Sequence, residues 1–367
     1  MNVGTKLENE EKIKIYKRIN ELLKIDNPVN SYKFIGNHPI SLTNDNIILL
    51  LKEDYMVCEK SDGVRMICLV IDQKIYFYDR KNEIYLIKDQ TKTIDNTNVD
   101  NNDNVDNTNV DQTKTVDNNT NVNIYTNVDN TNVDNANVDN NYIVDGELFY
   151  DNSGKLNYAV FDCLLFNNEN VCDKNLLKRL GYADLFIRNL IYKGDINFYL
   201  KIMYKSYGFL EIYNQIKNLN HKNDGLIFTP CFEKYILYKR GLLLKWKPPS
   251  INTIDFRLVK RSKGIYSLEC SYKNNEIIFD YFESDHEDLN NKIGEFIFDK
   301  DRIIRDIENE INILGGWVLY KIRDDKDTPN HYRVVNNILE SLEDNLDINE
   351  LSRYYKPMRH NTKHRMK

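Results

Sequence analysis

Residues 55–70 read Tyr55-Met56-Val57-Cys58-Glu59-Lys60-Ser61-Asp62-Gly63-Val64-Arg65-Met66-Ile67-Cys68-Leu69-Val70, two apolar runs joined by a charged turn. Runs of branched and aromatic residues on both sides of Asp-Gly predict two β-strands. Gly63 allows close approach of another backbone, and Arg65 opens the second strand, from which it is expected to point back over Lys60. The same residues also fit an ordinary hairpin turn, so the turn alone does not identify a site.

The neighbouring segments predict an antiparallel sheet. Three more strand-like runs follow, at residues 74–78, 83–87 and 142–144. Helical periodicity covers three other segments, residues 7–24, 174–193 and, more weakly, 207–219. We therefore expect an α+β fold whose first domain, residues 1–249, is built on an antiparallel sheet.

The pattern changes after Pro248-Pro249. Strand-like runs at residues 254–260, 265–272 and 276–282 resemble a small β-barrel, and helical patterns occur at 286–296 and 330–343. We place a second domain at residues 250–345 and a basic, flexible tail at 346–367. The cations of that tail, Lys356, Arg359, Lys363 and Arg365, either touch RNA or a phosphorylated partner or simply keep the chain end soluble.

Residues 91–141 form a low-complexity insert, in which the hexamer Asp-Asn-Thr-Asn-Val-Asp occurs at 95–100, 106–111 and 129–134. Such a segment has too little apolar surface to offset its ordering entropy, so we expect it to be disordered. A solenoid is the alternative, but the repeat is short and irregularly spaced. Loop-closure entropy grows only with the logarithm of length, so a folded domain tolerates the insert.

The composition excludes several classes of protein. The chain has 367 residues, of which 41% are hydrophobic, and a mean hydropathy of −0.60. Its longest uncharged apolar run, residues 47–51, is far shorter than the roughly 20 residues of a spanning helix, so no membrane or export segment is expected. Six scattered cysteines predict neither a zinc ribbon nor a disulfide framework. The net charge of −6 lies in the Asp-rich insert, so it does not exclude a phosphate or nucleic-acid partner.

Four further motifs accompany the Lys60 turn. In chain order they are Phe77-Tyr78-Asp79-Arg80, Val144-Asp145-Gly146-Glu147-Leu148, Asp224-Gly225-Leu226-Ile227-Phe228 and Leu243-Leu244-Lys245-Trp246-Lys247-Pro248. Lys245 and Lys247 are two residues apart, so on a strand both project from one face. A solvated edge strand would carry such lysines too, but Trp246 is then expected in the core, which turns both cations toward whatever the sheet faces. Paired cations suit a phosphate.

These five motifs, in this order, resemble the covalent nucleotidyltransferase superfamily and, within it, the mRNA capping enzyme guanylyltransferases. Residues 317–330, Trp-Val-Leu-Tyr-Lys-Ile-Arg-Asp-Asp-Lys-Asp-Thr-Pro-Asn, are similar to that family's C-terminal signature, and Asn37-His38-Pro39-Ile40-Ser41-Leu42 is similar to its lead-in. The resemblance runs from about residue 37 to 330, apart from the insert. Lys321 stands where the family usually has arginine, which puts a bidentate phosphate contact in doubt.

The resemblance implies that Lys60 attacks the α-phosphate of GTP and that the resulting lysine-bound GMP passes to the 5′-diphosphate end of RNA. A free lysine has a pKa of about 10.4, so burial, a metal and the cations Lys245 and Lys247 are expected to lower it. The implied cofactor is Mg²⁺ or Mn²⁺, and Glu147 and Asp224 are its candidate ligands because such ions prefer oxygen. In the family the matching carboxylates lie by the ribose and the α-phosphate respectively; both also fit turn positions at the edge of a core.

The remaining site residues are carried over from the resemblance in the same way. Arg65 and Arg80 match positions near the sugar and phosphate, although basic residues are also common on edge strands without function. Arg323, Asp325 and Lys326 would act on the β and γ phosphates from an oligonucleotide-binding (OB-fold) barrel that closes over the nucleotide. A charged turn before a Pro-Asn helix start would look the same. The candidates for guanine recognition are Phe77 and Ile227, which would stack on the base although such residues are usually core, and Lys201 or Lys205, which would donate to it.

The resemblance also implies partners and a location. GTP and 5′-diphosphate RNA would be substrates, in the nucleus, without a membrane. Since no His-Cys-x5-Arg phosphatase loop is present, the RNA triphosphatase would be a separate protein. A cap methyltransferase and the RNA polymerase II tail are further expected partners, although the sequence does not decide whether the tail is bound.

Two alternatives remain at this stage. An ATP-dependent polynucleotide ligase shares the lysine nucleophile and the barrel, but the block at residues 317–330 and the Leu-Lys-Trp-Lys-Pro run favour capping. A catalytically inactive RNA-binding scaffold is the second alternative, and the intact Lys60, Glu147 and Asp224 argue against it. Labelling by GTP, by ATP or by neither would separate the three.

Overall fold

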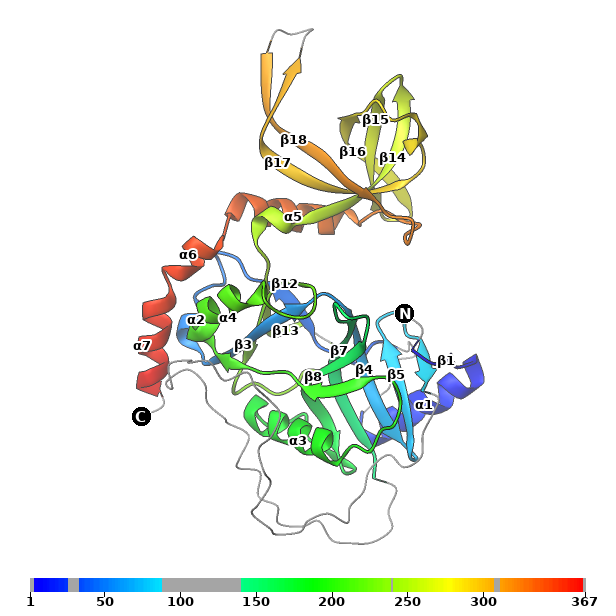
Figure 1. Ribbon diagram of the computed structural model, residues 1–367, viewed down its shortest axis with the longest axis vertical. Helices are drawn as coiled ribbons and strands as arrows, with labels where there is room; N and C mark the ends of the chain where they lie inside the picture. Colours follow the sequence, from blue (N-terminus) through cyan, green and yellow to red (C-terminus); the bar gives the residue numbers. More distant parts are fainter. Residues whose placement is uncertain (1–2, 26–32, 88–139, 239, 307–310, 366–367) are drawn as a thin grey trace. The chain divides into compact units, whose positions relative to one another are not determined.

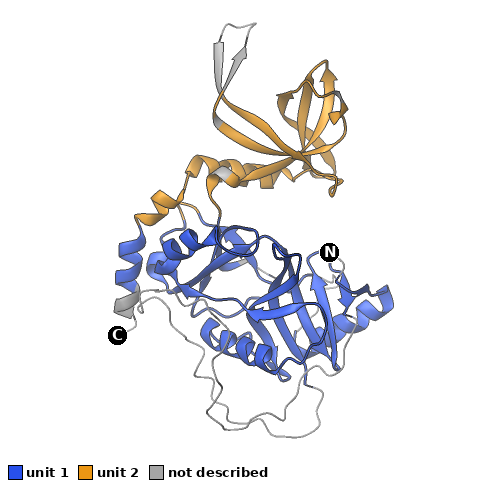
Figure 2. Cartoon of the chain, in the orientation of Figure 1, with its two compact units in different colours: residues 1–42, 46–246, 354–367 blue, residues 43–45, 247–353 orange. Residues whose placement is uncertain are grey.

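The computed structural model describes residues 3–25, 33–87, 140–238, 240–306 and 311–365. The chain forms two compact units, coloured separately in Figure 2: unit 1 comprises residues 1–42, 46–246 and 354–367, and unit 2 comprises residues 43–45 and 247–353. The change of unit after Trp246 lies close to the boundary expected from Pro248-Pro249. Most of the insert predicted at 91–141 lies outside the described residues.

Two β-sheets form the framework of unit 1 (Figure 1). The larger has the order β1 (Thr5–Lys6), β6 (Ile84–Leu86), β5 (Lys74–Asp79), β4 (Val64–Ile71), β7 (Tyr142–Tyr150), β8 (Leu156–Phe166) and β10 (Asn197–Leu200), with β9 (Glu169–Asn170) beside β8. The smaller has the order β11 (Tyr204–Lys205), β3 (Tyr55–Ser61), β12 (Asn223–Pro230), β13 (Arg240–Trp246) and β2 (His38–Ser41). Two of these pairs, β10 with β8 and β13 with β2, are parallel, and the others are antiparallel.

The turn at Asp62-Gly63 joins the two sheets, so the hairpin interpretation of this turn is wrong. Strand β3 belongs to the smaller sheet and β4 to the larger. Gly63 is required by space, because a Cβ there would lie 2.4 Å from the carbonyl oxygen of Leu148 on β7. The close approach expected of this glycine is therefore an approach to a neighbouring strand, and it fixes where the chain passes from one sheet to the other.

Helices bury both faces of the larger sheet. Ile67 and Leu69 on β4 pack with α1 (Asn9–Leu22), whereas Cys68 and Val70 on the other face share a core with α3 (Leu176–Asn189). This alternation follows from the two-residue repeat of a strand. The other helices of unit 1 are α2 (Leu49–Lys52), α4 (Phe209–Ile216), which follows the short 3₁₀ turn at Ser206–Gly208, and α7 (Tyr355–Arg365).

Unit 2 is a five-stranded antiparallel sheet with the order β16 (Asn275–Glu283), β15 (Ile265–Tyr272), β14 (Thr253–Ser262), β17 (Ile293–Asp306) and β18 (Ile311–Ile322). Its edge strands are joined by side chains, since Trp317 Nε1 on β18 donates to Asp280 Oδ2 on β16 at 2.8 Å. Phe256, Phe279 and Trp317 pack together inside. This closure is that of a small OB-type barrel, as expected.

Two expectations for this half of the chain are wrong. Residues 286–296 form no helix beyond the 3₁₀ turn Glu287–Leu289, because the buried Ile293 and Phe296 belong to strand β17. The predicted flexible tail instead forms α6 (Ile348–Ser352) and α7, after α5 (Tyr332–Asp344), and it is anchored by the buried Leu351 and Met358. In the described part of the chain no helix is both long and apolar enough to cross a membrane.

Candidate active site

Lys60 and Asp224 form the centre of the candidate site in unit 1. Ser61 pairs with Asn223 and Glu59 with Leu226, so two residues of β12, Asp224 and Gly225, lie opposite Lys60 alone. This is a β-bulge, and Gly225 supplies the φ of +148° that it needs. The bulge turns Asp224 toward the nucleophile candidate: its Oδ1 lies 2.7 Å from Lys60 Nζ.

Lys245 and Ile227 face the same side of the smaller sheet as Lys60. Ile227 pairs with Cys58 on one side and with Lys245 on the other, and Cys58 is two residues before Lys60. Trp246 points the opposite way, as predicted: it is 1% exposed and its ring meets that of Tyr213 on α4 at 5.6 Å. Lys247 is the first residue of unit 2.

The larger sheet contributes a second group of charges on one face. Arg65 pairs with Glu147 across β4 and β7, and Asp145 lies two residues earlier on β7. Arg65 Nε and a terminal nitrogen donate to Asp145 at 3.0 and 2.5 Å, and the other terminal nitrogen donates to the carbonyl of Asn37 at 2.6 Å. Tyr235 also donates to Asp145. The guanidinium is thus buried and held by protein groups, which is the environment of a positioning residue.

The charges of several cations act on the Glu147 carboxylate. Burial raises the pKa of Glu147, and the charges of Lys201, Lys60, Arg65 and Arg80 oppose that rise. Arg80 follows β5 and is exposed; desolvation and the charge of Arg65 lower its pKa. Glu147 is therefore the residue at which the charges of the two sheets meet.

Lys201 is buried among residues that sequence reasoning missed. Its Nζ lies 3.0 Å from Glu59 Oε1 and 2.8 Å from Ser61 Oγ, and His221 Nε2 lies 3.3 Å from the same Ser61 oxygen. Burial disfavours both charges, but their mutual attraction prevails, so the pKa of Glu59 is lowered and that of Lys201 is raised. Glu59 and Ser61 flank Lys60 in the sequence, which is the signal that could have drawn attention to them.

The prediction that Phe77 stacks on the base is wrong, because this side chain is buried in the core. Its side chain is 0% exposed and packs against Tyr158 and Phe198, with ring centroids 4.8 and 6.2 Å apart. Because Phe77 pairs with Cys68, it lies on the face of the larger sheet that is covered by α3, opposite the face of Arg65 and Glu147. Ile227 remains partly exposed, on the face of Lys60.

The basic block of unit 2 is paired with carboxylates of its own unit. Arg323 binds both oxygens of Asp325, at 2.8 and 2.7 Å, and also reaches Asp255 at 3.2 Å and Glu295 at 3.4 Å. Lys326 pairs with Asp255. Asp255 on β14 lies directly opposite Glu295 on β17, an arrangement of like charges that needs neighbouring cations to be stable.

The carboxylates of Asp224 and Glu147 fit an ion such as Mg²⁺, which takes most of its ligands from a substrate and water. Among the described residues no three His, Cys, Asp or Glu side chains gather as a metal-binding group. Mg²⁺ is commonly held by one or two carboxylates together with phosphate oxygens and water. Asp224 and Glu147 are suited to that limited role, and the residues of unit 1 offer no complete cage of protein ligands in the part described.

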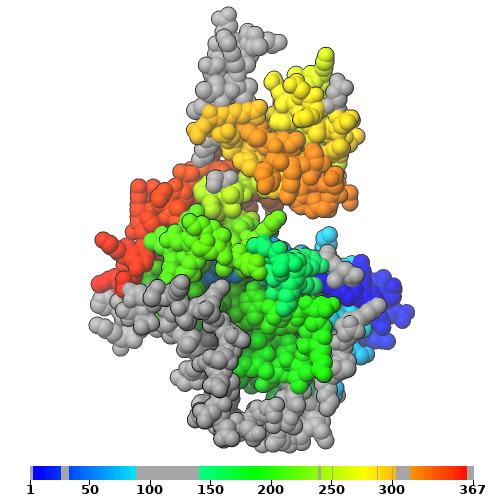
Figure 3. Space-filling view, viewed as in Figure 1, coloured from blue at the N-terminus to red at the C-terminus, as the bar shows by residue number. Residues whose placement is uncertain are grey.

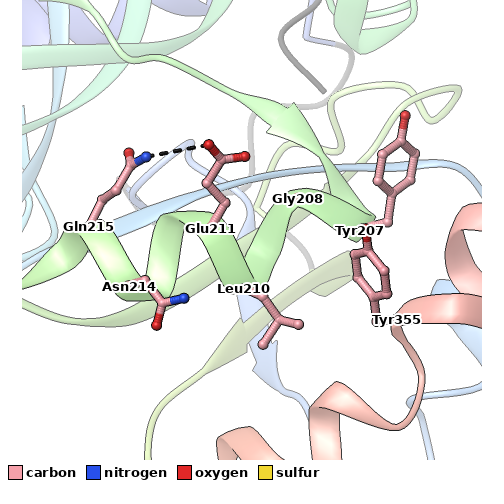
Figure 4. A pocket seen from close by; sticks show the side chains of 7 residues that line it. All are labelled: Tyr207, Gly208, Leu210, Glu211, Asn214, Gln215 and Tyr355. Carbon is pink, nitrogen blue, oxygen red and sulfur yellow. Dashed lines mark hydrogen bonds between the residues drawn. The ribbon is translucent and has the colours of Figure 1, made fainter. Parts of the chain in front are cut away.

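A hollow of about 390 Å³ lies elsewhere in unit 1 (Figure 4). It is lined by residues of α4, of the 3₁₀ turn before it and of α7, namely Tyr207, Gly208, Leu210, Glu211, Asn214, Gln215 and Tyr355. None of them is among the predicted site residues. On the face shown in Figure 3, the middle of the chain, coloured green, forms the centre of the visible surface of unit 1.

Comparison with known proteins identifies the family. The family model for the mRNA capping enzyme catalytic domain matches residues 2–249. The family model for the mRNA capping enzyme C-terminal domain matches residues 260–352. The chain is 26% identical to the mRNA-capping enzyme subunit alpha of Candida glabrata, over 89% of this chain and 81% of that protein. It is also 26% identical to the subunit of the same name from Schizosaccharomyces pombe, over 87% of this chain and 79% of that protein.

Among solved structures, a mycobacterial DNA ligase D complexed with ATP and MES aligns over 80% of this chain and 95% of that chain, with 10% identity and a TM-score of 0.39. A likeness at that level does not support a shared reaction. The two family matches cover the catalytic and C-terminal regions separately and together span nearly the whole chain, so they favour capping over ligation. The chain belongs to the mRNA capping enzyme family.

Proposed function

We propose that Lys60 is the nucleophile with which this mRNA guanylyltransferase takes GMP from GTP. The observation that carries the proposal is the bulge in β12, which places Asp224 at 2.7 Å from Lys60 Nζ. Lys245 lies on the same face of the sheet, at a position suited to the charge of a phosphate. A lysine held by a carboxylate and accompanied by a further cation is equipped for covalent catalysis at phosphorus.

The reaction has two steps. In the first, Lys60 Nζ bonds to the α-phosphorus of GTP, and the bond from that phosphorus to the bridging β-phosphate oxygen breaks to release pyrophosphate. An amine attacks with its lone pair, so the Lys60 ammonium must first lose a proton, and the Asp224 carboxylate, 2.7 Å from Lys60 Nζ, is an acceptor within reach. In the second step an oxygen of the RNA 5′-diphosphate displaces the lysine nitrogen, which regains a proton.

The neighbouring charges have separate tasks in this scheme. Lys245 and Lys247 neutralise the α-phosphate in both steps. Asp224 and Glu147 would help to hold Mg²⁺ or Mn²⁺, which when bound supplies further neutralisation of phosphate charge. Arg323 and Lys326, oriented by Asp325, would stabilise the pyrophosphate leaving group, a role carried by the family's C-terminal signature.

The base and sugar are assigned to a second set of residues. Lys201 donates to guanine, and Ile227, on the face of Lys60, packs against the base. Glu147 lies by the ribose, with Arg80 near the sugar and phosphate. Arg65 acts through Asp145 and Asn37, which it fixes in place, rather than by touching the nucleotide.

Membership of the family supports a proposed biological setting. GTP and 5′-diphosphate RNA are the proposed substrates, and the nucleus is the proposed location. A separate RNA triphosphatase would supply the diphosphate end, a cap methyltransferase would act on the product, and the RNA polymerase II tail would recruit the enzyme.

Covalent labelling tests the proposal directly. The protein is incubated with GTP or ATP labelled at the α-phosphate, with Mg²⁺ or Mn²⁺, and then separated by denaturing electrophoresis. Label retained from GTP and chased onto 5′-diphosphate RNA is the expected result. Label from ATP alone would indicate a ligase, and no label from either nucleotide would indicate an inactive scaffold.

A further inference from the structure

Lys201 is held at a fixed point beside the nucleophile strand. Its backbone N–H donates to Val160 O on β8 at 2.7 Å, and its side chain is buried, with the residue 4% exposed. The ammonium lies between Glu59 Oε1, at 3.0 Å, and Ser61 Oγ, at 2.8 Å. The strand that carries Lys60 therefore also carries both anchors of Lys201.

The anchors are themselves connected. Ser61 Oγ lies 3.3 Å from Glu59 Oε1 and 3.3 Å from His221 Nε2, and His221 Nε2 lies 3.7 Å from Glu59. The imidazole packs on the buried ring of Phe149, with centroids 4.4 Å apart and planes inclined by 31°. Three segments, β3, the residue after β10 and the loop before β12, thus meet in one closed network.

An ammonium so held can discriminate between purines. It has three N–H donors and no acceptor, and among the described residues Glu59 and Ser61 take two of those donors. Guanine presents a carbonyl oxygen at position 6, whereas adenine presents an amine, which is a donor. A site built to pair with a carbonyl rejects an analogue lacking it, because the buried donor is then left unpaired.

A buried lysine–glutamate pair could also serve the fold alone. Two observations favour a role at the site. Glu147 lies beside the turn that follows Lys60 and Ser61, since its Cγ would be 3.1 Å from a Cβ placed on Gly63, and the charges of both Lys201 and Lys60 act on it. Glu59 and Ser61 are the immediate neighbours of Lys60, so a change in their positions would be passed directly to the reacting strand.

We infer that Glu59, Ser61 and His221 are positioning residues that orient the Lys201 ammonium toward the position-6 carbonyl of guanine and thereby set the preference for GTP. The inference rests on the proposed function and concerns the specificity of the same site. Glu59 balances the charge, Ser61 fixes the direction of one N–H bond, and His221 holds Ser61 and Glu59 in place.

The test compares nucleotides whose bases differ from guanine at position 2 or at position 6. Initial rates of covalent labelling are measured with GTP, with ITP, which keeps the position-6 carbonyl, and with 2,6-diaminopurine riboside triphosphate, which carries an amine there. The variants are Lys201→Met, Glu59→Gln, Ser61→Ala and His221→Phe, the last of which keeps an aromatic ring against Phe149. Lys222→Ala, an exposed neighbour of His221, is the control.

We expect the wild type and Lys222→Ala to prefer GTP and ITP over the diamino nucleotide by at least about 100-fold, since polar recognition reaches larger ratios elsewhere. Lys201→Met should abolish the preference, and Glu59→Gln and Ser61→Ala should each reduce it about tenfold, with a smaller loss for His221→Phe. Equal loss of labelling with all three nucleotides, at an unchanged ratio, would show a structural role and overturn the inference. A wild type that forms no adduct with any nucleotide would instead overturn the proposed function itself.

Discussion

The charges around Lys60 and those around Arg323 differ in how firmly their partners hold them. In unit 1, Arg65 and Lys201 are buried against Asp145 and Glu59. In unit 2, Lys321 and Lys326 have side chains that are 54% and 35% exposed, although they too rest on carboxylates. Breaking a buried ion pair leaves an uncompensated charge and costs several kcal/mol, whereas an exposed pair contributes little.

This difference indicates which cations can change partners. The buried pairs of unit 1 are permanent, and the proposed function assigns the nucleotide to their surroundings. Three cations of unit 2, Lys321, Arg323 and Lys326, share Asp255 and Glu295, so one of them can leave for a phosphate while the others keep the two carboxylates paired. We therefore expect substitutions of the buried cations in unit 1 to affect every step or the fold, and substitutions of Arg323 or Lys326 in unit 2 to affect one step.

The largest expected effect is at Lys60. Lys60→Ala should abolish the GMP adduct without unfolding the protein, because only the nucleophile is removed. Lys60→Arg should be equally inactive, since a guanidinium does not lose its proton near neutral pH. Denaturing electrophoresis after incubation with labelled GTP measures the adduct, and circular dichroism checks the fold. Robust labelling of either variant would reject Lys60 as the nucleophile.

Arg65 should have the largest effect on stability. Arg65→Ala leaves Asp145 buried without its cation, which should lower the free energy of unfolding by about 3–5 kcal/mol. Urea denaturation measures that change. Arg188→Ala, which breaks the exposed pair with Asp184, is the matched control and should cost no more than about 0.5 kcal/mol. Similar losses in the two variants would remove the distinction between permanent and exposed pairs.

Arg323 and Lys326 should separate the two steps of the reaction. If they stabilise departing pyrophosphate, Arg323→Ala or Lys326→Ala should slow GMP-lysine formation by about 2–4 kcal/mol, as for the loss of one preorganised charge donor. Transfer of GMP from isolated labelled enzyme to 5′-diphosphate RNA releases no pyrophosphate and should be hurt far less. Lys245→Ala and Lys247→Ala should impair both steps.

The control for this experiment is Arg333→Ala, which removes an exposed arginine of the same unit, near the start of α5. It should leave both steps unchanged. Equal damage to both steps in the Arg323 and Lys326 variants would assign these residues to the structure of the barrel. In that case the ion pairs of unit 2 would not be exchangeable, contrary to the comparison above.

The α+β fold class and the order of the motifs could be predicted from the sequence. The contacts between distant strands could not. Trp246 was expected in the core because alternation along a strand fixes which side chains share a face. The passage of the chain between sheets at Gly63 could not be predicted, because the same residues fit a hairpin. Phe77 was misassigned for a related reason: its place on a strand was clear, but whether it shared a face with Arg65 and Glu147 was not.

The residues around Lys201 were missed because their relation exists only in three dimensions. His221 is separated from Ser61 by 160 positions, and no local pattern joins them. The bulge opposite Lys60 was equally hidden, since Asp-Gly occurs in many turns. Sequence periodicity reports faces and ends of elements, whereas register and bulges depend on which strands become neighbours.

The smallest expected effect is from removing the low-complexity insert. Hydrogen bonding and strand register place Ile87, Ile75, Val70 and Tyr142 in a row across the larger sheet, so the connection from β6 to β7 must span three strand spacings, about 14 Å. Deleting residues 95–139 leaves residues 88–94 and 140–141, which reach up to about 30 Å when extended. Adduct formation by the deletion variant should therefore stay close to wild type, and its unfolding free energy should change by no more than about 1–2 kcal/mol, since closure entropy depends weakly on length. A loss of folding, or more than a tenfold fall in labelling with GTP, would show that the insert contributes contacts to unit 1 and would extend the permanent framework beyond the two sheets.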